Sequence, residues 1–197
     1  MGLFQRVRRT VPAERSFHYE AAASLSGLED AVYGYLNDYN PNFRREMVYI
    51  CIGTDRATGD CLGPLVGTQL AAAGVSPYVY GTLERPVHAG NLYEVLDDIN
   101  RKCPQAIVLA VDASLGSTDR IGWISLRSGS LKPGTALQKE LPEVGDFHIS
   151  GVVNIGGFLD QMVLQNTRLY VVHRMADVIA RAVGGAHRRF AGKYAAK

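Results

Sequence analysis

Two aspartates occupy positions from which carboxyl groups commonly act in α/β proteins. Asp60 lies in the segment GTDRATGDCLGP, just before a predicted helix, and Asp112 ends the apolar run AIVLAVDA. Two carboxyl groups that share one site cannot easily both ionise, so one of them is held protonated. The charged member can then activate a water molecule while the protonated member polarises a carbonyl oxygen. Such a pair is suited to the hydrolysis of a peptide bond.

Each aspartate also has a purely structural interpretation. Asp60 could cap the helix that follows it, because aspartate accepts hydrogen bonds from the free amides of a helix start. Asp112 could stabilise the next turn through Ser114 or Gly116. We favour a functional role for Asp112, because only apolar residues precede it and its strand would carry a carboxyl group out of the core.

Other residues with reactive or ligating side chains follow the same predicted strands. Asp55, His88 and His148 lie in loops after strands and are candidates for binding. A pKa lowered by the helix start would make Cys61 a candidate nucleophile, although a minor one beside the two aspartates. Ser114 lies in DASLG, which lacks the first glycine of a nucleophile elbow, so it is not expected to act as one.

The sequence predicts no cofactor and no metal. The three cysteines are widely spaced and indicate neither a disulfide framework nor a zinc cluster. The glycines after the first predicted strand do not form a dinucleotide-binding pattern, and no lysine follows them as in a phosphate-binding loop.

Strands and helices alternate in the part of the chain that must position the two aspartates. Strands are predicted at 47–53, 78–84 and 106–113, with helices at 64–73 and 91–101 between them and a further helix at 21–40. This order predicts a parallel sheet with right-handed crossovers. Because ligands bind outside the carboxyl ends of such strands, Asp60 and Asp112 are expected to meet at that edge.

The remaining segments are predicted less regularly. The link after Asp112 is too short for a crossover helix, so the strand at 122–126 should pair antiparallel. An irregular loop is expected at 128–149, followed by a helix at 154–166, a strand at 169–172 and a helix at 175–184. Residues 1–18 are expected to form an extended or loosely ordered arm, and residues 19–197 a single α/β domain.

The composition is that of an ordinary globular protein. The 21 lysines and arginines nearly balance the 19 acidic residues, giving a formal net charge of +2. This balance disfavours nucleic acid as the main ligand, because duplex binders usually carry a strong basic surplus. No apolar run suits a signal peptide or a membrane span, so we expect a cytoplasmic protein that does not bind membranes.

The segments GTDRATGDCLGPLVG and AIVLAVDASLG together resemble the YyaC family of sporulation proteins, over about residues 45–185. They are more distantly similar to the germination protease and to the hydrogenase maturation peptidases. The resemblance implies a three-layer phosphorylase/hydrolase-like fold, with a mostly parallel mixed sheet flanked by helices. In the germination protease, two aspartates form an atypical aspartic-peptidase site. One lies in a D-A-L-G-P motif, matched here by Asp60 to Pro64, and the other precedes alanine, matched here by Asp112 and Ala113.

The resemblance implies a sporulation-associated peptidase with Asp60 and Asp112 as catalytic residues. Its substrate would be a protein or peptide, small spore proteins among them, and its compartment the cytoplasm or the forespore. Two alternatives stay open: a binding or regulatory module without activity, and a metal-dependent or metal-sensing hydrolase that uses Asp112 with His88 or His148. The first nickel-recognising acid of the hydrogenase maturation peptidases has no clean counterpart in this chain. A homo-oligomer is compatible with every alternative.

Overall fold

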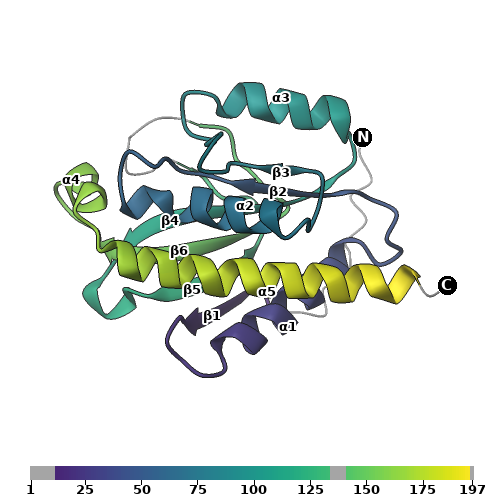
Figure 1. Ribbon diagram of the computed structural model, residues 1–197, viewed down its shortest axis with the longest axis horizontal. Helices are drawn as coiled ribbons and strands as arrows, with labels where there is room; N and C mark the ends of the chain where they lie inside the picture. Colours follow the sequence, from purple (N-terminus) through teal and green to yellow (C-terminus); the bar gives the residue numbers. More distant parts are fainter. Residues whose placement is uncertain (1–11, 134–140, 196–197) are drawn as a thin grey trace.

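A six-stranded mixed sheet forms the centre of the molecule (Figure 1). The structure is a computed structural model that describes residues 12–133 and 141–195. The strand order is β1-β5-β6-β4-β2-β3, in which β3, β2, β4 and β6 run parallel and β5 runs antiparallel to both of its neighbours. The strands are β1 (Glu14–His18), β2 (Met47–Cys51), β3 (Val79–Tyr80), β4 (Ile107–Gly116), β5 (Trp123–Ser128) and β6 (Phe147–Ile155).

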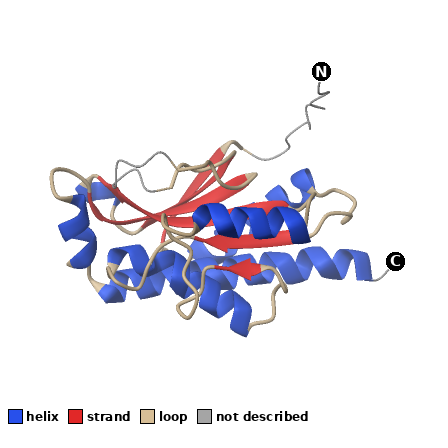
Figure 2. Ribbon diagram, turned by 90° about the horizontal axis from the view of Figure 1, so that it is seen from above, coloured by secondary structure: helices blue, strands red, loops and turns tan. Residues whose placement is uncertain are grey.

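Helices cover both faces of this sheet, as the view from above also shows (Figure 2). On one face lie α1 (Ser24–Tyr39), α2 (Leu62–Ala72) and α5 (Leu169–Ala195), and on the other lies α3 (Leu92–Lys102). The short helix α4 (Asp160–Gln165) projects at one end, and two 3-10 turns, η1 (Gly59–Cys61) and η2 (Thr118–Arg120), complete the set. The predicted α/β class, with a mostly parallel mixed sheet between helices, is confirmed.

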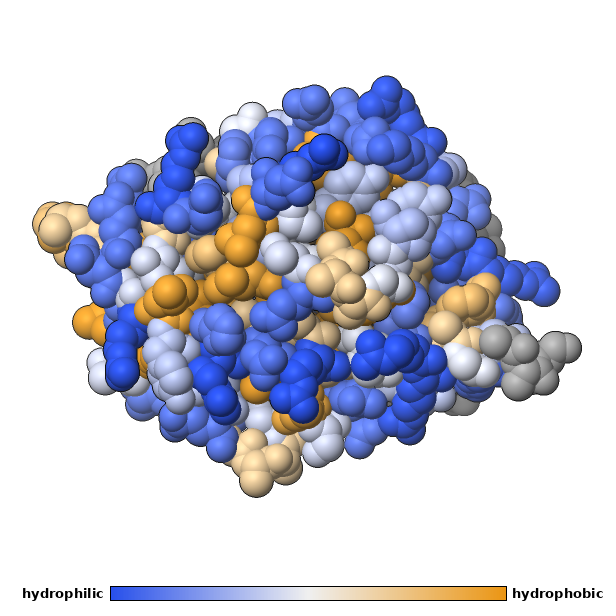
Figure 3. Space-filling view, viewed as in Figure 1, coloured by the Kyte–Doolittle hydropathy of each residue, from blue (hydrophilic) through white to orange (hydrophobic). Residues whose placement is uncertain are grey.

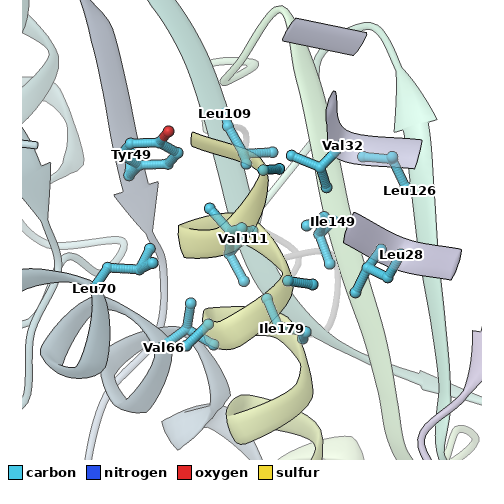
Figure 4. Close-up of a cluster of buried hydrophobic side chains, with 14 of the residues drawn as sticks. Leu28, Val32, Tyr49, Val66, Leu70, Leu109, Val111, Leu126, Ile149 and Ile179 are labelled. Carbon is cyan, nitrogen blue, oxygen red and sulfur yellow. The ribbon is translucent and has the colours of Figure 1, made fainter. Parts of the chain in front are cut away.

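The sequence of β2 is apolar without a break because both faces of the strand are buried. Its five residues are all buried, because alternate side chains enter two different cores. Tyr49 packs with the helices α1, α2 and α5 (Figure 4), whereas Val48 and Ile50 pack under α3. Fully burying one such aliphatic side chain contributes about 1.5–3 kcal/mol, so β2 is firmly held where the site begins.

The end of the predicted N-terminal arm belongs to the sheet. Residues Glu14–His18 pair antiparallel with β5 as its outer neighbour. The hydroxyl groups of Ser16 and Ser125 lie 2.8 Å apart across these strands, and Phe17 packs on the core beneath α1. The earlier part of the arm, residues 1–11, lies outside the described residues.

The prediction was wrong for the segment that forms β6. Residues 147–155 were assigned partly to a loop and partly to a helix, but they form a strand between β4 and β5. Phe147, Ile149 and Val153 alternate with the more polar His148 and Ser150, which is the period of a strand with two different faces. The predicted antiparallel pairing of the strand near 122–126 is confirmed by β5.

The predicted strand at 169–172 is instead the first turn of a long helix. α5 runs for 27 residues, well beyond the predicted 175–184. Its buried residues recur at helical spacing, among them Val172, Met175, Ile179 and Val183, and this face outweighs the β-branched start. The second predicted strand is shorter than expected, since only Val79 and Tyr80 pair with β2.

Candidate active site

The two aspartates come together because β2 ends beside the middle of β4, next to Asp112, and the loop after β2 carries Asp60. Cys51 is the last residue of β2 and pairs with Val111, and the backbone amide of Ile52 still donates to the Val111 carbonyl at 2.7 Å. Asp112 follows directly on β4. The sequence predicts Asp112 at the carboxyl end of its strand. This is wrong, because β4 runs on to Gly116 and Asp112 lies within it.

The loop after β2 folds back so that Asp60 lies above the end of that strand. Gly53 starts this loop with a φ of 141°, and a Cβ atom there would collide with the backbone carbonyl oxygen of Asp60. The amide of Thr54 donates to the same carbonyl at 3.2 Å. Asp60 itself lies in η1, immediately before α2, so a glycine at position 53 is what allows η1 to approach the strand end.

Asp60 and Asp112 line the same cavity, whose volume is about 570 Å³. Its walls come from the loops after β2 and β3, from the carboxyl-terminal half of β4 and from α4. Both apolar and polar side chains line it, as is usual for sites that orient a ligand with a few polar groups. Asp60 and Asp112 therefore line one cavity, as expected, although Asp112 lies within β4 and not at the edge of the sheet.

The surroundings of the two carboxyl groups separate their proton affinities. Burial raises the pKa of Asp112 well above its ordinary value, and the negative charge of Asp60 raises it further. A hydrogen bond of 2.8 Å from the Ala113 amide to Asp112 Oδ1 offsets only part of this. Burial also raises the pKa of Asp60, but the Thr54 backbone and the nearby His88 oppose the change. Asp112 therefore holds its proton more tightly than Asp60 does.

His88 and Asp55 also line the cavity. His88 precedes α3, and its Nδ1 accepts a hydrogen bond of 3.1 Å from the Gly90 amide. With Nδ1 as an acceptor, the ring proton of the neutral imidazole is on Nε2, which leaves one donor for a ligand. Asp55 is exposed in the loop after β2 and contributes negative charge close to Cys61.

His148 is not part of this cavity. It lies near the start of β6, where it pairs with Ala110, and its ring is buried. Its Nδ1 lies 2.8 Å from the Gly129 carbonyl oxygen, so it helps to hold the loop after β5. The structure thus gives His148 a place in the packing and does not bring it to Asp112.

The two nucleophile candidates have surroundings that disfavour nucleophilic chemistry. Burial and the charges of Asp55 and Asp60 raise the pKa of Cys61, so its thiol stays protonated. Ser114 lines the cavity, but its hydroxyl oxygen accepts a hydrogen bond of 2.9 Å from Ser150, and no base is bonded to it. Neither side chain is activated.

The wall formed by α4 was missed in the sequence. Asp160, Gln161, Leu164 and Gln165 line the cavity from a segment far along the chain that carries no motif. The Asp160 carboxylate accepts a hydrogen bond of 2.8 Å from the Gly157 amide, which fixes the turn before the helix. Recognition of β6 would have revealed this wall, because the loop after a parallel strand belongs to the site edge.

The described residues hold neither a metal-binding cluster nor a membrane-spanning helix. Within residues 12–133 and 141–195, no group of three histidine, cysteine or acidic side chains is arranged to hold a metal ion. Of the helices in that part of the chain, none has the length and apolar character to span a bilayer.

Known proteins resemble this chain over most of its length. The model of a family described as "Protein of unknown function (DUF1256)" matches residues 16–182, which include every cavity-lining residue. The uncharacterized protein YyaC of Bacillus subtilis (strain 168) is 49% identical over 140 residues, which are 71% of this chain and 68% of that protein. The chain therefore belongs to the DUF1256 family, and its identity to YyaC makes it a member of the YyaC family.

Proposed function

We propose that this chain is a peptidase of sporulating bacteria that hydrolyses a peptide bond with Asp60 and Asp112 acting on a water molecule. The observation that supports it is the placement of both carboxyl groups in one cavity, with their pKa values raised to different extents. Pairs of titratable groups whose surroundings separate their pKa values are typical of acid and base partners in catalysis. The substrate is a protein or peptide, with small spore proteins as the first candidates.

The chemistry follows from the protonation of the two groups. The Asp60 carboxylate takes a proton from water as the water oxygen bonds to the peptide carbonyl carbon, and Asp112 donates its proton to the carbonyl oxygen. In the tetrahedral intermediate, the proton on Asp60 passes to the amide nitrogen and the C–N bond breaks. Asp112 regains a proton from the hydroxyl group of the departing acid. Each positioned acid or base of this kind contributes typically about 10²–10⁴-fold in rate.

The rest of the cavity is suited to an amide substrate. Gln161 and Gln165 on α4 offer both hydrogen-bond donors and acceptors, which is what a peptide backbone requires. Nε2 of His88 supplies a further donor from the opposite loop. A volume of about 570 Å³ is in the usual range for a site that encloses a few residues of a ligand.

The direct test is cleavage of a peptide library and of small spore proteins by the full chain, followed by mass spectrometry. Asp60→Asn and Asp112→Asn keep the shape of each side chain but remove the titrating oxygen, so both should abolish cleavage. The matched control is Asp177→Asn, which makes the same change at an exposed ion pair with Arg181 on α5. Cleavage that survives both site changes would contradict the proposal, and a stable complex without cleavage would favour a regulatory module.

A further inference from the structure

We propose that the exposed apolar surface around α4 is the interface of a twofold homodimer. This surface, called the α4 patch, consists of Ile155, Phe158, Leu159 and Met162. Their side chains are 46%, 96%, 58% and 55% exposed, although all four are large and apolar. The proposal does not depend on the chemistry of the cavity.

The composition around the α4 patch is that of an interface and not of a solvated loop. From Val153 to Thr167 the only charged residue is Asp160, whose carboxylate bonds the Gly157 amide and lines the cavity. The cores of protein interfaces are depleted of charge and enriched in aromatic residues and methionine. Apolar side chains are visible at this end of the molecule, where α4 projects (Figure 3; compare Figure 1).

The helix α4 stays largely exposed to solvent in the single chain. α4 has six residues, and none of them is buried. A helix this short is not stable in water by its own hydrogen bonds, so it depends on the packing of its faces. One face lines the cavity through Gln161 and Leu164, and another carries the half-exposed Met162, beside Leu159, which precedes the helix.

A second copy fits this surface because a projection and a hollow lie side by side. Phe158 projects almost fully into solvent. Beside it is a shallow hollow of about 330 Å³ whose lining exposes no polar surface. The hollow is lined by Asn154, Ile155, Leu159, Met162, Val163 and Asn166. A twofold axis through the patch would place each Phe158 in the hollow of the other chain, which is the self-complementary contact of an isologous dimer.

The area reaches the size of a small specific interface. With roughly 200 Å² for each large side chain when fully exposed, the α4 patch presents about 500 Å² of apolar surface. Two patches together bury about 1,000 Å², the lower bound for a specific interface. Leu169 and Tyr170, exposed at the adjoining start of α5, add to this area. Dimerisation would also fix α4, and with it one wall of the cavity.

The test is sedimentation velocity of the full chain over a range of micromolar concentrations, with Phe158→Asp and Met162→Lys as separate variants. The wild type should dimerise, and each variant should raise the dimer dissociation constant by at least about 30-fold, as loss of an interface hot spot does. Mixing the two variants should restore a heterodimer, because Asp at 158 of one chain then faces Lys at 162 of the other.

The control is Tyr93→Asp, which removes a large side chain that is 62% exposed on α3, away from the patch. It should leave the dimer unchanged. Hydrogen exchange provides a second readout, since α4 amides should become more protected as the wild-type concentration rises. A monomer at every concentration, or a dimer that Phe158→Asp leaves intact, would overturn the proposal. The proposal would also be overturned if the protein were a monomer and Phe158→Asp raised only the KM for a peptide, because the α4 patch would then bind substrate.

Discussion

The carboxyl groups of Asp60 and Asp112 interact across the cavity that both line, and the charge of Asp60 raises the pKa of Asp112. The two residues reach this position by different routes. Asp60 is in a 3-10 turn that Gly53 allows to fold over β2, whereas Asp112 is within a central strand. The shift in the pKa of Asp112 therefore depends on how η1 packs against β4, and this shift can be measured without a substrate.

Asp112→Asn should stabilise the protein at neutral pH. Because the pKa of Asp112 is raised on folding, the native state binds this proton more tightly than the unfolded state. Its contribution to stability is complete below about pH 4, the unfolded pKa, and is lost as the pH rises through the folded pKa. The free energy of unfolding of wild type and variant, measured by urea denaturation, should agree at low pH and diverge above it. Parallel curves at all pH values would contradict the raised pKa.

Asp60→Asn should lower the pKa of Asp112 toward its ordinary value without restoring it completely. The charge of Asp60 is the second cause of the shift, and burial, the larger cause, stays in place. The carboxyl carbon of Asp112 can be followed by NMR as the pH is varied. An unchanged titration in the variant would show that the two groups do not interact.

His88→Ala should reduce turnover by about 10²–10³-fold if Nε2 donates to the carbonyl oxygen in the transition state. His88→Gln should recover part of the activity, because its amide group retains an N–H donor. The informative comparison is His148→Ala. His148 lies outside the cavity and bonds the Gly129 carbonyl, so its loss should lower the melting temperature with little effect on kcat. Equal losses of kcat at both positions would contradict these assignments.

Gly53→Ala should destabilise the protein and displace Asp60. At φ 141° an added methyl group meets the Asp60 carbonyl oxygen, so the cost is at least about 1–3 kcal/mol. The control is Gly192→Ala in α5, where a Cβ meets nothing, and where alanine should stabilise the helix by about 1 kcal/mol. Thermal denaturation of both variants checks the opposite signs.

Tyr49→Phe should test the buried contact between β2 and α5. The Tyr49 hydroxyl lies 2.7 Å from Nδ1 of His187, and burial lowers the pKa of His187, so the neutral ring accepts this bond. Removing the hydroxyl leaves a half-buried nitrogen without that donor, at a cost of about 1 kcal/mol. The exposed Tyr93→Phe should change the free energy of unfolding by less than about 0.5 kcal/mol.

The sequence was most informative where one physical signal dominated. Continuous apolar runs identified β2 and β4, and the short link after Asp112 correctly required an antiparallel β5. These elements were sufficient to predict that Asp60 and Asp112 would lie together. The cavity that they share, and the side chains that complete it, depended on segments with weaker signals.

The failures have a common cause in competing local patterns. β6 has polar residues on one face, so its sequence resembles neither a buried strand nor a helix. Because this strand was not predicted, the position of α4 at the cavity was not predicted either. The first turn of α5 is rich in β-branched residues, yet packing on α1 and α2 decides its conformation. The placement of His148 in a loop at the site was wrong, because it lies near the start of β6, a strand whose bounds periodicity alone did not define.

The pairing of β1 with β5 has a consequence for how the chain acquires its fold. Glu14–His18 is synthesised well before its partner Trp123–Ser128, which lies about 100 residues further along the chain. Until then, β1 lacks the strand with which it pairs, and Phe17 lacks most of the core on which it packs. Contacts this distant in sequence slow folding, so the early segment is open to aggregation or chaperone binding during synthesis.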